Sequence, residues 1–113
     1  MKQGDIILFP IQQADGKVKP RPVLLLKQLP GHGDWLGCGI SSQLHEYIKG
    51  FDLMLDASVP DFKTSGLKLP AVIRLGFLSS IPSQKIPGAI GKISDTAVKQ
   101  LLKNLSDYLG KEI

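Results

Sequence analysis

The sequence predicts a mainly β protein, a small barrel of short strands followed by one C-terminal helix. Two observations lead to this prediction. Between residues 5 and 81, short apolar or alternating runs are separated by turns rich in Gly, Pro and Asp, and only after residue 94 does the apolar spacing become helical. With 113 residues and no shift in composition along the chain, we expect a single domain spanning residues 1–113.

The first two strands are expected to form a hairpin. The first strand is expected at residues 5–9, and Pro10 then indicates a sheet edge or a bulge, because proline has no N–H to donate to a neighbouring strand. Residues 12–19 are polar and contain Asp15-Gly16, which predicts a long loop. The second strand is expected at residues 23–28.

Four further strands follow from the same signals. They are predicted at residues 35–44, 51–56, 71–75 and 77–81, with a turn at 29–34, a loop at 57–70 and Gly76 between the last two. The C-terminal helix is expected to begin after Ser94, a residue that can cap it, and to end at Gly110. Its apolar positions follow helical spacing: Val98, Leu101, Leu102, Leu105 and Leu109.

Composition excludes several classes of protein. Fourteen Lys and Arg against ten Asp and Glu give a formal charge of +4, which modestly favours a polyanionic partner. No apolar run approaches the roughly 20 residues of a membrane span, and residues 1–5 lack a signal-peptide pattern, so we expect a cytoplasmic protein without membrane contacts. The single cysteine, Cys38, with His32 and His45 makes a poor zinc set, and we expect no metal.

The most informative stretch is Lys19-Pro20-Arg21-Pro22, at the start of the second strand. Each proline fixes its own φ and restricts the residue before it, so Arg21 loses little backbone freedom when it binds an anion. This pattern favours phosphate recognition. The alternative is a loop that happens to contain prolines and one solvated cation.

The third strand divides into two faces, because successive side chains point to opposite sides. The apolar row is expected to face the core: Leu36, Cys38, Ile40, Ser42 and Leu44. The other row resembles a surface for single-stranded nucleic acid, with a tryptophan to stack on and polar groups to donate: Trp35, Gly37, Gly39, Ser41 and Gln43. A second buried face is the competing interpretation.

Arg74 interrupts an apolar strand, where a cation must pair, extend to solvent or face a groove. An ion pair with Asp52 or Asp56 is one explanation, and a secondary role in binding is the other. A Ser41–His45–Asp52 triad is excluded by spacing, because four residues of extended chain put Ser41 roughly 13 Å from His45. No Gly-x-Ser-x-Gly, Walker or dinucleotide motif is present.

Three short motifs in order carry a family resemblance: Gly4-Asp5-Ile6, then Arg21-Pro22-Val23, then Ile40-Ser41. Together with the terminal helix, they make nearly the whole chain resemble PemK/MazF toxins. The resemblance implies an SH3-like barrel and a homodimer, as is usual for these toxins. These cut single-stranded RNA as mRNA interferases, without metal or other cofactor, and are silenced by a cognate antitoxin.

The resemblance also implies roles for particular residues. The catalytic arginine corresponds to Arg21, and the catalytic hydroxyl, generally a threonine, corresponds to Ser41. Ala71 stands where many relatives have serine, so a catalytically inactive nucleic-acid- or peptide-binding barrel is the alternative function. Substrate contacts are expected from five side chains: Lys17, Lys19, Trp35, Gln43 and Arg74.

Overall fold

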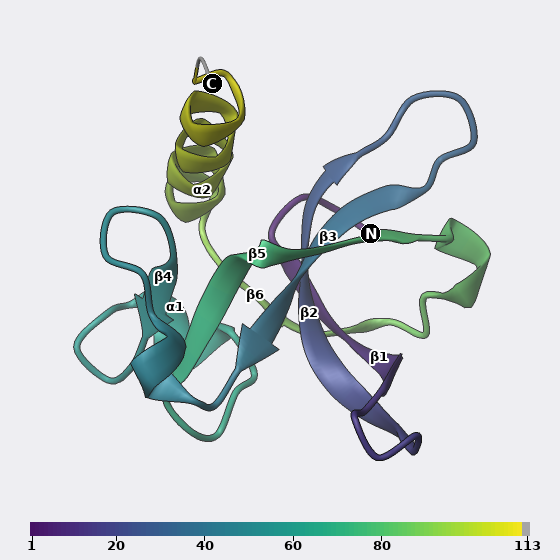
Figure 1. Ribbon diagram of the computed structural model, residues 1–113, viewed down its shortest axis with the longest axis horizontal. Helices are drawn as coiled ribbons and strands as arrows, with labels where there is room; N and C mark the ends of the chain where they lie inside the picture. The colour runs from purple at the N-terminus through teal and green to yellow at the C-terminus, as the bar shows by residue number, and fades with distance from the viewer. Residues whose placement is uncertain (112–113) are drawn as a thin grey trace.

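The computed structural model describes residues 1–111. Within that range six antiparallel strands form one curled, half-barrel sheet in the order β4-β5-β3-β2-β1-β6, with the longest helix, α2, against one side (Figure 1). The strands are β1 (Asp5–Gln12), β2 (Val18–Gln28), β3 (Trp35–Ser41), β4 (Leu53–Leu55), β5 (Ala71–Ile81) and β6 (Ala89–Lys92). The helices are η1 (Leu44–Glu46), α1 (Asp61–Thr64), η2 (Ser83–Lys85) and α2 (Asp95–Leu109). The predicted mainly β fold with a C-terminal helix is confirmed.

The sheet buries apolar side chains on both of its faces. Alternate residues of β2 enter different clusters, with Leu24 and Leu26 in one and Val23 and Leu25 in the other. The helix-side core also contains Ile6, Cys38, Ile40, Leu55, Ala71, Ile73, Leu75, Ile93, Val98, Leu101 and Leu105. The second core is completed by Ile7, Trp35 and Ile81. A strand buried on both faces reads as a continuous apolar run, which explains residues 23–26.

The β1–β2 hairpin is longer than the sequence predicts. β2 begins at Val18, five residues before the expected start, and the loop shrinks to residues 13–17. β6 pairs with β1 only as far as Ile7, and β3 pairs with β2 only from Val23 onward. The outer part of the hairpin is therefore a two-stranded ribbon, and Arg21 lies inside a strand opposite Phe9 rather than in a loop.

β5 is one bent strand where two were expected. Ile73 pairs with Ile40 and Leu78 pairs with Cys38, so β5 advances by five residues while β3 advances by two. The additional residues form an irregularity that bends the strand, and Gly76 lies within it. β3 and β4 are also shorter than predicted, and β6 was not expected from sequence.

The C-terminal helix follows its prediction closely. The Ser94 hydroxyl accepts a hydrogen bond from the Ala97 backbone N–H at 3.2 Å, which satisfies one of the first-turn donors. The helix ends at Leu109, whose side chain is exposed, and Gly110 follows it with a right-handed φ of −84°. None of the helices within residues 1–111 has the length and apolar character that a membrane crossing requires.

Candidate active site

A cleft of about 560 Å³ opens where the outer β1–β2 ribbon meets the bend of β5. Its walls come from the ribbon, the end of β3, η1, the loop before β5 and β5 itself. The lining residues that can form hydrogen bonds through their side chains are Gln13, Arg21, Ser41, Ser42, Gln43, Glu46, Lys68 and Arg74. The two predicted catalytic residues, Arg21 and Ser41, therefore lie in the same cleft.

Strand register explains how Arg21 and Ser41 meet. β2 pairs with β3 through Val23 and Gly39, and the same register continued by two residues places Arg21 across from Ser41. Opposed residues of antiparallel strands point to the same face of a sheet. The pairing stops before that point, and the two strand ends leave the cleft between them.

The Arg21 guanidinium is oriented by a neighbour that the sequence did not single out. Its Nη2 donates to Gln13 Oε1 at 2.8 Å, and Gln13 Nε2 donates to the Ile11 carbonyl at 3.0 Å. Both the oxygen and the nitrogen of the Gln13 amide are thus held by hydrogen bonds. The bond to Gln13 uses only one of the N–H donors of the Arg21 guanidinium. Arg21 is exposed, so its remaining donors can reach an anion in the cleft.

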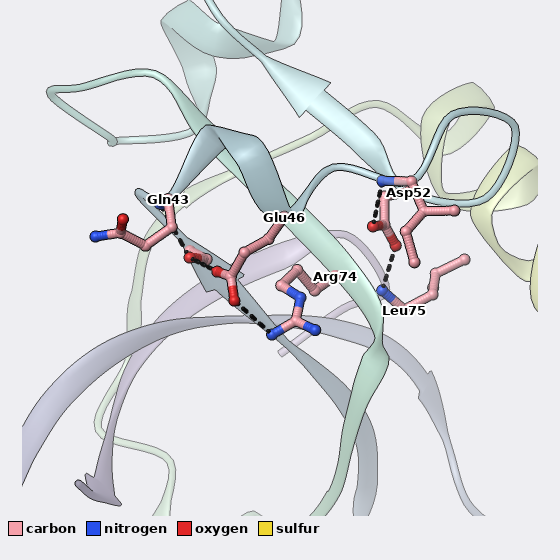
Figure 2. Close-up of polar contacts among 7 residues, drawn as sticks. Gln43, Glu46, Asp52, Arg74 and Leu75 are labelled. Atoms are coloured by element: carbon pink, nitrogen blue, oxygen red, sulfur yellow. Dashed lines mark hydrogen bonds and ion pairs between the residues drawn. The ribbon is translucent and has the colours of Figure 1, made fainter. Parts of the chain in front are cut away.

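The Ser41 hydroxyl makes two hydrogen bonds where β3 ends. Its Oγ donates to Glu46 Oε1 at 2.5 Å and accepts from the Gln43 backbone N–H at 3.0 Å (Figure 2). The short helix η1 turns the chain back after β3 and brings Glu46 beside Ser41. No periodic pattern marks Glu46 in the sequence, because the contact depends on this turn.

Arg74 extends from β5 to the same carboxylate. Its Nη1 lies 3.3 Å from Glu46 Oε2, and both side chains are about 30% exposed (Figure 2). The suggested pairing of Arg74 with Asp52 or Asp56 is wrong. Asp52 instead accepts from the backbone N–H groups of Ile48 and Leu75, each at 3.0 Å, next to the bend of β5.

Trp35 lies away from the cleft, and the expectation that it is exposed is wrong. It is 6% exposed in the second core, at the opposite end of β3 from Ser41. Gly37 faces the same core, since a Cβ there would lie 2.7 Å from Ile81 Cδ1. The competing interpretation, a second buried face, is the correct one for this half of β3.

Residues 2–109 match the family described as PemK-like, MazF-like toxin of type II toxin-antitoxin system. The chain belongs to this family of toxins. The match covers nearly the whole chain and confirms the resemblance drawn from its motifs. A search of curated protein sequences finds no match to the chain. Membership of a type II system implies that the toxin has an antitoxin partner.

The other predicted contact residues of the toxin divide into two groups. Gln43 and Arg74 line the cleft, whereas Lys17 in the β1–β2 loop and Lys19 on the outer ribbon are exposed and are not among the lining residues. Lys68 lines the cleft from the loop before β5 and was not anticipated. The sequence could not predict that Lys68 lines the cleft, because residues 57–70 carry no periodic pattern.

The remaining titratable groups of the toxin lie elsewhere. His32 is in the β2–β3 turn, at the end of β3 far from Ser41, and His45 is exposed on η1 outside the cleft lining. Cys38 is buried in the helix-side core, where burial, assisted by the charge of Asp52, raises the pKa of its thiol to about 12. Within residues 1–111, no cluster of three or more His, Cys, Asp or Glu side chains is arranged to hold a metal ion.

Proposed function

We propose that this toxin is a metal-independent endoribonuclease that cuts single-stranded RNA in the cytoplasm, acts as a homodimer and is silenced by a cognate antitoxin. The observation that carries the proposal is the meeting of Arg21 and Ser41, from separate strands, in one cleft. These are the two residues to which the family resemblance assigns catalytic roles. Family membership supports the toxin function itself.

The charges of the cleft suit an anionic polymer. Arg21, Lys68 and Arg74 line it, and Glu46 is the single carboxylate among the lining residues. The volume lies within the roughly 300–1,000 Å³ range of ligand sites. Phe77 is 46% exposed at the wall and offers an aromatic face on which a base can stack.

The proposed reaction uses the RNA's own 2′-hydroxyl as nucleophile. It attacks the adjacent phosphorus, and the products are a 2′,3′-cyclic phosphate and a 5′-hydroxyl. Negative charge accumulates on the phosphoryl oxygens during attack, and Arg21 donates hydrogen bonds to them. Arginine stays protonated at neutral pH, so Arg21 acts as an electrostatic stabiliser rather than as a proton donor.

A non-catalytic nucleic-acid-binding barrel is the second candidate function. One observation favours it: the single Ser41 proton is already donated to Glu46, so this hydroxyl is not arranged to donate to a phosphate. Ala71, where many relatives have serine, is buried at the cleft wall and offers no hydroxyl. A binding module would retain Arg21 and the basic cleft without needing either hydroxyl.

The test incubates the purified toxin with a long unstructured RNA in the presence of a chelator. We expect fragments with 2′,3′-cyclic phosphate ends, and rates lower by about 10²-fold or more for Arg21→Ala, the loss typical when a preorganised charge stabiliser is removed. Ser41→Ala should also cleave slowly. Lys99→Ala is the matched control, because it removes an exposed cation from α2, away from the cleft.

Substrate chemistry supplies a second check. An oligonucleotide with 2′-deoxyribose throughout should bind the wild type and remain intact, because it lacks the nucleophile. RNA left whole by the wild type, with binding that depends on Arg21, would refute the nuclease and support the binding module. Cleavage of the 2′-deoxy oligonucleotide would refute the proposed nucleophile.

A further inference from the structure

Glu46 has a distinctive place in the cleft. Among the lining residues it is the one carboxylate, and none of them is a histidine. It is therefore the lining side chain best suited to accept a proton, because the other charged side chains of the lining are cations. Its Oε1 is already joined to the Ser41 hydroxyl by a 2.5 Å hydrogen bond.

The hydrogen bonds of Ser41 determine what its oxygen can still do. A seryl hydroxyl has one proton to donate and two lone pairs to accept with. The proton goes to Glu46, and one lone pair accepts from the Gln43 backbone N–H. Towards the cleft, Ser41 therefore presents an acceptor. A phosphoryl oxygen is itself an acceptor and cannot pair with it, whereas the ribose 2′-hydroxyl is a donor and can.

Arg74 keeps Glu46 in this arrangement. It binds Oε2, the carboxylate oxygen that Ser41 does not use, at 3.3 Å. The adjacent residue on β5, Leu75, is held through its backbone N–H by the buried Asp52 carboxylate. The other charged residues of the cleft lining are Arg21 on β2 and Lys68 in the loop before β5, while His45 on η1 lies outside it.

We propose that Glu46 takes up the proton of the attacking 2′-hydroxyl through Ser41, an inference that rests on the proposed ribonuclease function. As the O2′–P bond forms, the O2′ proton moves to Ser41 Oγ and the Ser41 proton moves to Glu46 Oε1. The P–O5′ bond breaks, and O5′ takes a proton from water. Glu46 then returns its proton to solvent, so the enzyme is unchanged.

The test compares Glu46→Gln with the wild type over a range of pH. The amide of this variant would keep an oxygen that accepts from Ser41 but cannot take up the proton, so the cleavage rate should fall by about 10²–10⁴-fold. The wild-type rate should decline at acidic pH as the carboxylate becomes protonated, and Glu46→Gln should lose this decline. Glu46→Asp retains a carboxylate and should keep the decline at a lower rate.

Two further measurements separate this relay from a structural role. Glu46→Gln should bind a 2′-deoxy oligonucleotide at least as tightly as the wild type, because one negative charge has left the cleft. The double variant Ser41→Ala/Glu46→Gln should cleave no more slowly than the slower single variant, since both changes interrupt one relay. Asp107→Asn, which breaks the exposed Lys103–Asp107 pair on α2, is the matched control.

The results of these experiments distinguish a failure of the proton relay from a failure of the ribonuclease function on which it rests. RNA left intact by the wild type overturns both. Two results would overturn the relay while the wild type still cleaves RNA, which leaves the nuclease function supported. In the first, the rate of Glu46→Gln still declines at acidic pH. In the second, the fold-losses of the two single variants multiply in the double variant. If Glu46→Gln unfolds, Glu46→Asp decides alone: a folded variant whose rate no longer declines at acidic pH would contradict the relay.

Discussion

The buried Asp52 carboxylate holds the backbone of β5 next to Arg74, and its removal should lower the free energy of unfolding. The side chain is 7% exposed and accepts hydrogen bonds from two backbone N–H groups, those of Ile48 and Leu75, each at 3.0 Å. A hydrogen bond to a charged group contributes roughly 1.5–3 kcal/mol. Asp52→Ala breaks both and leaves the Leu75 N–H without its acceptor, so we expect the free energy of unfolding to fall by about 3–5 kcal/mol.

Urea unfolding followed by circular dichroism measures this change, and Asp56→Ala is the matched control. Asp56 lies in the same part of the chain, and within residues 1–111 its carboxylate binds only Ser58, near the surface, so its removal should matter far less. Asp52→Asn keeps one acceptor oxygen and should fall between wild type and Asp52→Ala. A loss below about 1 kcal/mol for Asp52→Ala would refute the reasoning, because the two N–H groups would then be satisfied without the carboxylate.

Two further predictions concern β3. Gly37→Ala should destabilise the protein by about 1–3 kcal/mol in urea unfolding, because its Cβ would lie 2.7 Å from the fully buried Ile81. Gly39→Ala is the matched control: the equivalent contact is with the half-exposed Phe77, which can move, so its loss of stability should be smaller. Equal losses of stability would contradict this distinction. Burial raises the pKa of the Cys38 thiol to about 12, so as pH rises this thiol ionises in the unfolded chain before it ionises in the folded protein. Its contribution to the free energy of unfolding is therefore fully present below about pH 9 and is lost between about pH 9 and pH 12. Between pH 8 and pH 10 the stability of wild type relative to Cys38→Ala should fall by about 1.4 kcal/mol in urea titrations, and parallel profiles would contradict it.

The sequence predicted the elements whose signals are local. The Ser94 cap and the apolar spacing after it determine where α2 begins and which side it buries. The bend of β5 was taken for a break because Gly76 ends a local pattern, and continuity there depends on pairing with β3. β6 was missed because its few residues gain strand geometry by pairing with β1.

The candidate site shows the same division. Arg21 and Ser41 were found from motifs, and their meeting in one cleft depends on a register that local pattern does not reveal. Alternation separated the two faces of β3 correctly as far as Ser41, but Ser42 and Leu44, which were expected in the core, follow the end of the strand and are exposed. Alternation also did not show what covers each face, and Trp35 was therefore assigned to a surface that the second core occupies. Glu46 reaches Ser41 only through the turn at η1.

The prolines beside Arg21 have a role beyond fixing its backbone. In the ribbon Pro20 pairs with Pro10, and two residues without N–H groups can oppose each other only where the missing donors point outward. Pro22 lies two residues after Pro20, so its backbone nitrogen also points outward, towards the side of β2 on which β3 lies. At Pro20 and Pro22 this edge of β2 therefore has no N–H to donate to the end of β3. Pairing between β2 and β3 stops at Val23, and the chain turns away after Ser41 into η1. The sequence that restrains Arg21 thus also opens the space in front of it and lets Glu46 return to Ser41.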